Sequence, residues 1–239
     1  MLSQVADRPL VQGDPVAVVD DILEDADLTA TLVREAGFVP VIIAPPPPSI
    51  EHLLSRIRND ARALVCDHRL TGTANVAYYG AEVVARSNKD HIPAVLLTTY
   101  ADVDTQSIRR WRSGIPRLLR RGRESDPDTL FESLVQADEE ASGRYEDNRR
   151  AFRTVVRVEG VRTVEGTRVA EVVVSAWNPS EVVEIPLALM AGAVGEASDD
   201  QLRGKRFMAY VNIYADTADE LYFRDFEEAP EVPEGWPER

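Results

Sequence analysis

The chain has 239 residues, of which 28% are charged and 44% hydrophobic, and its formal net charge is −14. This length suffices for one large domain or two modest ones, each with its own core. Residues 1–150 hold 18 basic against 24 acidic residues, and residues 151–239 hold 9 against 17. Neither part has the basic excess that binding to a nucleic-acid backbone requires, so nucleic acid is not an expected partner.

The cysteine content and the apolar pattern favour a cytoplasmic protein. Cys66 is the only cysteine, which excludes an intrachain disulfide and favours a reducing compartment. No apolar run approaches the roughly 18 residues of a membrane span. The first residues show no basic segment followed by an apolar core. We therefore expect neither a membrane segment nor a secretion signal.

The first part of the chain alternates short apolar runs with amphipathic stretches. The apolar runs predict buried strands over residues 16–19, 38–44, 63–66, 94–97 and 115–119. Helical spacing predicts helices over residues 22–37, 50–59, 80–87, 102–113 and from residue 126 or 128 through 135. Five strand–helix pairs with right-handed crossovers predict an α/β fold with a doubly wound, five-stranded parallel sheet.

A charged connector and a different periodicity follow. Residues 137–150 are nearly free of large apolar side chains, which predicts a solvated helical connector. Beyond it, alternation with period two predicts strands over residues 154–158, 168–176, 182–187, 206–214 and 220–226, separated by Gly or Asn-Pro turns. We therefore predict an α/β domain over residues 1–136, the connector, and a small all-β, barrel-like domain over residues 151–239.

Acidic and hydroxyl side chains follow three of the predicted parallel strands. Asp20 and Asp21 follow the first, Asp67 follows the third, and Thr98 follows the fourth. Because the carboxyl ends of parallel strands meet at one edge of a sheet, we expect these groups to lie close together. Crowded carboxylates attract a divalent cation, and Mg²⁺ prefers oxygen ligands. For the acidic pair alone, the alternative is a solvated helix N-terminus, where Asp is favoured.

Residues 14–136 resemble the receiver domain of two-component response regulators, through the ordered segments VVDD at 18–21, LVCD at 64–67 and VLLT at 95–98. The resemblance implies that Asp67 accepts a phosphoryl group from a histidine kinase and that the hydroxyl of Thr98 bonds the phosphoryl oxygen. It also implies that Asp21, Asp67 and the backbone carbonyl of Arg69 ligate Mg²⁺ directly, and that Asp20 acts largely through water.

Three positions in and next to the fifth predicted strand depart from the receiver pattern, and Thr71 replaces the usual proline after Asp67. The lysine that pairs with the phosphoryl group in that family is Arg120 here, and the proline after it is Arg121. The family's switch aromatic falls at Arg117. Arginine keeps the positive charge but differs in shape and reach, so Arg120 is not a conservative replacement at a crowded phosphate. The sequence therefore leaves open whether Asp67 is phosphorylated.

Other polar and aromatic groups each have more than one interpretation. His68 flanks Asp67 and either tunes it or is a solvated loop histidine. Five aromatic residues of the second domain form either its core or, with nearby arginines, a stacking surface for single-stranded nucleic acid, and the acidic charge favours the core: Tyr210, Tyr214, Tyr222, Phe223 and Phe226. Seven arginines around the fifth strand fit an acidic partner, a nucleotide, a second copy or a solvated surface: Arg109, Arg110, Arg112, Arg117, Arg120, Arg121 and Arg123.

Two hypotheses follow for the function. The first is a two-component-type signalling protein that binds Mg²⁺, accepts a phosphoryl group on Asp67 and thereby regulates a β-rich, partner-binding domain. The second is a phosphorylation-independent pseudo-receiver that serves as a dimerising scaffold or adaptor subunit of a bacterial multi-protein system. A histidine kinase or another bacterial signalling protein is the expected partner, together with a second copy of the chain. No further catalytic constellation is present, so we do not expect an enzyme.

Overall fold

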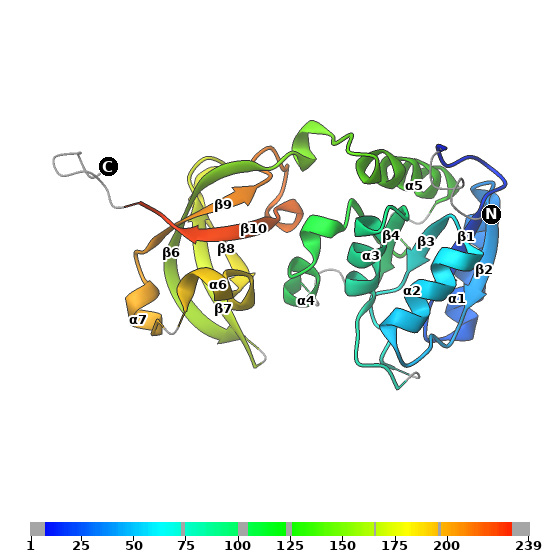
Figure 1. The fold of residues 1–239 in the computed structure, drawn as a ribbon, viewed down its shortest axis with the longest axis horizontal. Helices are drawn as coiled ribbons and strands as arrows, with labels where there is room; N and C mark the ends of the chain where they lie inside the picture. The colour runs from blue at the N-terminus through cyan, green and yellow to red at the C-terminus, as the bar shows by residue number, and fades with distance from the viewer. Residues whose placement is uncertain are drawn as a thin grey trace. The chain divides into compact units, whose positions relative to one another are not determined.

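The computed structural model describes residues 8–72, 75–99, 105–122, 126–164, 166–195 and 197–230. The chain divides into two compact units, residues 1–146 and residues 147–239 (Figure 1). Among the helices of the described residues, none combines the length and the apolar character that crossing a bilayer requires.

The first unit is built on a parallel sheet, as the apolar runs predict. Its strands are β1 (Pro15–Val19), β2 (Val39–Ile43), β3 (Ala63–Cys66), β4 (Ala94–Thr98) and β5 (Arg117–Arg120). They lie in the order β2-β1-β3-β4-β5, and each neighbouring pair is parallel. The order reverses between β1 and β3, and the carboxyl ends of strands at such a reversal are where open α/β sheets bind ligands.

In the described part of this unit, α-helices connect and cover the strands. They are α1 (Leu23–Glu35), α2 (Ile50–Asp60), α3 (Gly80–Lys89), α4 (Thr105–Arg109) and α5 (Pro127–Ala141). Two of them begin at side-chain caps: Ser49 accepts a hydrogen bond from the N–H of His52 at α2, and Asp126 accepts one from the N–H of Thr129 at α5. A cap satisfies one backbone donor that the helix leaves unpaired, which fixes where the helix starts.

Alternate residues of the sheet pack into two separate cores. Leu64 and Leu96 lie in a core with side chains of α2 and α3. Val65 and Leu97, one residue further along each strand, lie in a second core with side chains of α1 and α5. Helices therefore cover both faces of the sheet, which is why its strands read as continuous apolar runs.

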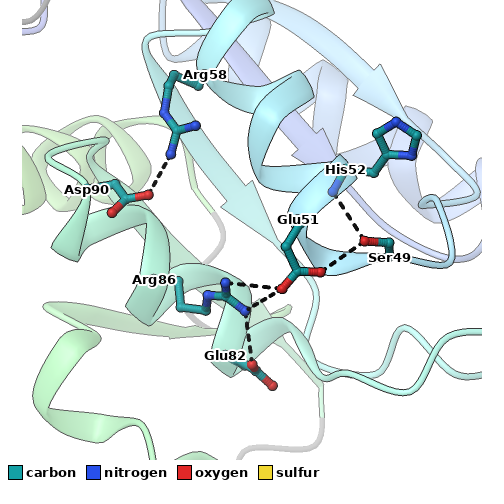
Figure 2. A network of polar contacts seen from close by, with 7 residues as sticks. All are labelled: Ser49, Glu51, His52, Arg58, Glu82, Arg86 and Asp90. Atoms are coloured by element: carbon teal, nitrogen blue, oxygen red, sulfur yellow. Dashed lines mark hydrogen bonds and ion pairs between the residues drawn. The ribbon is translucent and has the colours of Figure 1, made fainter.

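Charged side chains join α2 to α3 at the surface of the first unit (Figure 2). Arg86 on α3 pairs with Glu51 on α2 at 3.3 Å and with Glu82 of its own helix at 3.4 Å. Arg58 on α2 pairs with Asp90, the residue that follows α3, at 2.6 Å. The pairs that join the two helices are exposed and add little stability, because water and salt screen them.

The second unit is a single antiparallel sheet with short helical turns. Its strands are β6 (Phe152–Val164), β7 (Thr167–Val174), β8 (Asn178–Pro186), β9 (Arg206–Val211) and β10 (Phe223–Glu228). The helical segments are η2 (Asp147–Arg149), η3 (Leu187–Met190), α6 (Ala191–Val194), α7 (Asp199–Leu202) and η4 (Ala218–Glu220). The strand order is β10-β9-β6-β7-β8, so the predicted β-rich domain is confirmed. Within the described residues, β8 and β10 remain edge strands and no pairing closes a barrel.

The predicted turns of the second domain differ from the observed ones. Gly160 does not end a strand: β6 continues through it to Val164, with an irregular register against β7 between Val158 and Gly160. Asn178 and the proline after it begin β8 instead of separating two strands. In the sequence, glycine and the Asn-Pro pair indicate turns, whereas a bulge and an edge strand accommodate glycine and proline without ending the pairing.

The helix predicted over residues 102–113 is also shorter in the structure. It appears as α4 followed by η1 (Arg112–Gly114), and residues 102–104 lie outside the described residues. The N–H of Trp111 bonds to the carbonyl of Ile108, a tighter turn than that of an α-helix. Ile108 and Ile115 are buried in the same core. Both side chains thus contribute to the core although the segment between them is not a regular helix.

Candidate functional site

Two carboxylates lie side by side at the point where the strand order reverses. In the register of β1 and β3, Val19 is opposite Cys66, so Asp20 and Asp67 are the next residues on adjacent strands. The N–H of Asp67 donates to the carbonyl of Val19 at 2.9 Å, which continues the pairing to the acidic residues. The structure thus brings together two side chains that are 47 positions apart in the sequence.

Two other residues named from the sequence end the neighbouring strands β4 and β5. Thr98 ends β4 and lies opposite Arg120, the last residue of β5. The exposed fraction is 3% for Asp20, 7% for Asp21 and 0% for Thr98. The side chain of Asp67 is 13% exposed. Burying carboxylates at one edge costs free energy unless a cation or hydrogen-bond donors compensate their charge.

The compensating cation is Arg121, which the sequence analysis did not assign to the site. Its Nη2 donates to Oδ2 of Asp20 at 3.0 Å and lies 3.6 Å from Oδ1 of Asp67. Its Nη1 donates to Oγ1 of Thr29 at 3.0 Å and to the backbone carbonyl of Asp25 at 3.5 Å, both on α1. One guanidinium therefore links the ends of β1 and β3 to α1.

The alternation of side chains along a strand explains why Arg121 makes these ion pairs. Leu119 of β5 and Val65 of β3 lie in the core that α1 and α5 cover. Two residues beyond them come Arg121 and Asp67, which the period of two places toward the same face. The alternation is visible in the sequence and could have identified Arg121. The role assigned to Arg120 stays a prediction.

Backbone N–H groups hold the remaining oxygens of the two carboxylates. The N–H of Ile22 donates to Oδ1 of Asp20 at 3.1 Å, and the N–H of Arg69 donates to Oδ2 of Asp67 at 2.7 Å. With the guanidinium of Arg121, each of the four oxygens of Asp20 and Asp67 has a partner in the protein. The described contact of Arg69 with the site is thus its backbone N–H.

The environment raises the affinity of both acids for a proton. Burial, followed by the negative charge of Asp20, raises the pKa of Asp67 to about 6, while Arg121 and backbone N–H groups oppose the rise. Burial also raises the pKa of Asp20, against the N–H of Ile22 and the charge of Arg121. Asp67 is therefore mostly ionised at pH 7, the form that a nucleophilic carboxylate requires.

The start of α3 packs directly against the backbone of Asp67. The N–H of Gly80 donates to the carbonyl of His68 at 2.9 Å. A Cβ at Gly80 would overlap the carbonyl oxygen of Asp67 and would lie 3.0 Å from Sγ of Cys66. Only glycine permits this approach, so Gly80 fixes the backbone at the acidic residue although it follows thirteen positions later. Sequence reasoning placed Gly80 at a helix start without assigning it to the site.

His68 is buried, so the solvated reading of this histidine is wrong. Its exposed fraction is 0%. The ring stacks on Tyr79 at a centroid distance of 5.2 Å, and Nε2 lies 2.9 Å from Oγ of Ser107 on α4. These contacts tie the residue after Asp67 to the residue before α3 and to α4, an arrangement that no local pattern in the sequence indicates.

The acidic residues, as arranged, do not fit a magnesium ion. Among the described residues, no group of three His, Cys, Asp or Glu side chains is placed to hold a metal. Mg²⁺ demands near-octahedral oxygen ligands at about 2.0–2.1 Å, whereas the oxygens of Asp20 and Asp67 already accept N–H groups or face Arg121. The carboxylate of Asp21 lies close to Gly72, where an added Cβ would be 2.7 Å from Oδ2 of Asp21.

The aromatic residues of the second unit divide between core and surface. Tyr222 and Phe223 are buried, and Phe226 packs partly buried against the same core. Tyr210 and Tyr214 are exposed, and the guanidinium of Arg224 lies 5.5 Å from the ring centroid of Tyr210. The core interpretation is therefore right for three of the five residues, and Tyr210 belongs to an outer face that also carries arginine.

No family model and no curated protein sequence matches the chain. Its structure matches solved structures of response regulator receiver domains over somewhat more than half of its length. A receiver domain from Clostridium thermocellum is 15% identical, and the match covers 55% of this chain and 99% of that one, with a TM-score of 0.41.

Two further matches also cover somewhat more than half of this chain at low sequence identity. The signal receiver domain of a modulated diguanylate cyclase from Desulfovibrio desulfuricans G20 is 18% identical, with 56% of this chain and 100% of that chain covered and a TM-score of 0.45. NtrX from Brucella abortus is 20% identical, with 56% of this chain covered and a TM-score of 0.41. The chain spans only 28% of the NtrX chain.

Proposed function

We propose that this protein is a two-component-type signalling protein in which Asp67 accepts a phosphoryl group and thereby regulates the β-rich unit. The observation that carries the proposal is the position of Asp67: it follows β3 at the reversal of strand order, buried and ionised beside Arg121. A nucleophile at this place meets a bound ligand at the open edge of the sheet.

The chemistry needs an ionised carboxylate and positive charge near the incoming phosphoryl group. In the step, an oxygen of Asp67 bonds to phosphorus, the bond between phosphorus and the donor's leaving group breaks, and an acyl phosphate forms. Arg121 is placed to offset the added negative charge, and Thr98 carries a hydroxyl that can donate to a phosphoryl oxygen. Arg120 stays the candidate for a second positive charge.

Magnesium is the other source of positive charge that the receiver resemblance implies. Its expected ligands are Asp20, Asp21, Asp67 and the carbonyl of Arg69, and a bound ion there would neutralise charge on the transferred group. No step above depends on the ion, because the observed arrangement of these residues does not fit it. The phosphodonor in this proposal is a histidine kinase or another bacterial signalling protein.

A second function is favoured by the ion pairs of Arg121. A guanidinium that already links Asp20 and Asp67 makes the acidic pocket stable without a ligand. This suits a pseudo-receiver that acts without phosphorylation, as a dimerising scaffold or adaptor subunit in the cytoplasm. The two proposals differ in one measurable property, the formation of an acyl phosphate at Asp67.

The test is a phosphorylation assay on the full chain with acetyl phosphate, with and without Mg²⁺. The first proposal expects an intact-mass increase of one phosphoryl group that hydroxylamine removes, and its loss in Asp67→Asn. Asp27→Asn is the matched control, since Asp27 is an exposed residue of α1. If no adduct forms while light scattering shows a stable dimer, the scaffold proposal replaces the first. An adduct that persists in Asp67→Asn would contradict the assignment of the acceptor.

A further inference from the structure

The guanidinium of Arg121 is held from three elements of the first unit. It reaches Asp20 after β1, Asp67 after β3, and both Thr29 and the backbone of Asp25 on α1. Thr29 is itself buried and Arg121 is only 23% exposed. The planar, permanently charged fork of arginine is suited to such a fixed set of acceptors.

A divalent cation at the same carboxylates would compete with this guanidinium. It would have to approach oxygens that lie 3.0 Å and 3.6 Å from Nη2, within the positive field of Arg121. At such distances two positive charges repel strongly in a partly buried site. Entry of the cation would also break the hydrogen bond to Thr29, since Arg121 would have to move away.

The backbone donors point to the same conclusion. The N–H groups of Ile22 and Arg69 take the oxygens that Arg121 leaves, one on each carboxylate. The oxygens of Asp20 and Asp67 are therefore all occupied by donors from within the chain, and hydrogen bonds to an ionised oxygen offset part of its charge.

We propose that Arg121 takes the place of a divalent cation in this pocket, so that the charge of the acidic pair is partly offset without metal, and that Thr29 positions the guanidinium. The inference deepens the proposed function of the same site. It predicts that the pocket gains affinity for a divalent cation when Arg121 is removed. This property can be measured whether or not Asp67 is ever phosphorylated.

The experiment is an isothermal titration of the metal-free full chain with Mg²⁺ alone. The expected result is weak or undetectable binding by the wild type, and affinity at least about tenfold higher in Arg121→Gln. Thr29→Val, which removes the acceptor that anchors Nη1, is expected to give a smaller gain. Arg34→Gln is the matched control, since it removes the same charge from an exposed position on α1 and should bind as the wild type does.

A second readout covers the case in which Arg121→Gln folds poorly. Because a ligand that binds only the folded state stabilises it, Mg²⁺ should raise the melting temperature of Arg121→Gln and not that of the wild type. Arg121→Lys keeps the charge and should stay insensitive to Mg²⁺. Wild-type binding of Mg²⁺ as tight as that of Arg121→Gln would overturn the proposal, and so would a gain that persists in Arg121→Gln/Asp67→Asn.

The outcome is separable from that of the phosphorylation assay. If no acyl phosphate forms but Arg121→Gln gains metal affinity, the proposed function is contradicted and the inference about Arg121 is supported. If the wild type forms an acyl phosphate only with Mg²⁺, the inference about Arg121 is contradicted and the proposed function is supported.

Discussion

Arg121 and Asp20 are 101 positions apart in the sequence, and their side chains form a 3.0 Å ion pair at the carboxyl edge of the parallel sheet. The carboxylate of Asp20 is almost fully buried, and Arg121 also faces Asp67. Removing one partner of such a pair leaves an uncompensated charge, which is costlier than removing both. The pair is therefore a structural element of the site and not a surface contact.

Arg121→Gln is expected to lower the free energy of unfolding by roughly 2–3 kcal/mol, less than for a fully buried pair because the guanidinium is partly exposed. Asp20→Asn in the same background should restore part of the loss, with a coupling of about 1–2 kcal/mol. Urea titrations of the wild type, both single variants and the double variant form the cycle. Additive effects of the two substitutions would contradict a direct ion pair.

The stability of the first unit should depend on pH through Asp67. Its pKa is raised in the folded protein to about 6 from 3.8, so between about pH 4 and pH 6 the folded state holds more protons than the unfolded state. Stability contributed by this group is therefore complete at low pH and is lost as the pH rises to about 6, by up to about 3 kcal/mol.

Asp67→Asn isolates this dependence, since asparagine resembles the protonated acid and does not titrate. Relative to the wild type, the variant should be similarly stable at pH 4 and more stable at pH 7. Urea titrations of both proteins at several pH values measure the difference, in which the contribution of Asp20 largely cancels. A difference between the two proteins that does not change from pH 4 to pH 7 would contradict the raised pKa.

The strands of the first unit and the meeting of Asp20 with Asp67 could be predicted because both depend on local sequence. Buried parallel strands are continuous apolar runs, and a carboxylate directly after such a run lies at the edge where ligands bind. The pairing of β6 with β7 across Gly160, by contrast, could not be predicted, because a glycine in a bulge and a glycine in a turn give the same sequence signal.

The contacts of Arg121 and His68 were harder to predict, for different reasons. Arg121 lies beyond the end of β5, and the receiver resemblance drew attention to Arg120, although the period of two along the strand favours Arg121. His68 is buried by Tyr79 and Ser107, which come from a loop and a helix far along the chain. Such burial is set by tertiary packing and leaves no periodic trace.

The ion pairs between α2 and α3 should contribute little to stability. Arg86→Ala removes the exposed contact with Glu51 and the partly buried contact with Glu82 (Figure 2). We expect a small decrease in the urea midpoint at low ionic strength and none in concentrated salt, because screening already weakens the pairs of the wild type. A large decrease in the urea midpoint that does not depend on salt would mean that Arg86 also packs against the core through its aliphatic stem.

Gly80→Ala should disturb both the stability of the first unit and the site itself. An added Cβ would overlap the carbonyl oxygen of Asp67, and α3 must shift to relieve the contact. Overpacking of this kind costs about 1–3 kcal/mol, and the shift should also change the pKa of Asp67. Gly192→Ala is the control, because a Cβ there meets open space, and its effect should stay within about 0.5 kcal/mol. If Gly80→Ala has the same urea midpoint of unfolding as the wild type and the same pH dependence of stability, the close approach of α3 to Asp67 does not exist in solution.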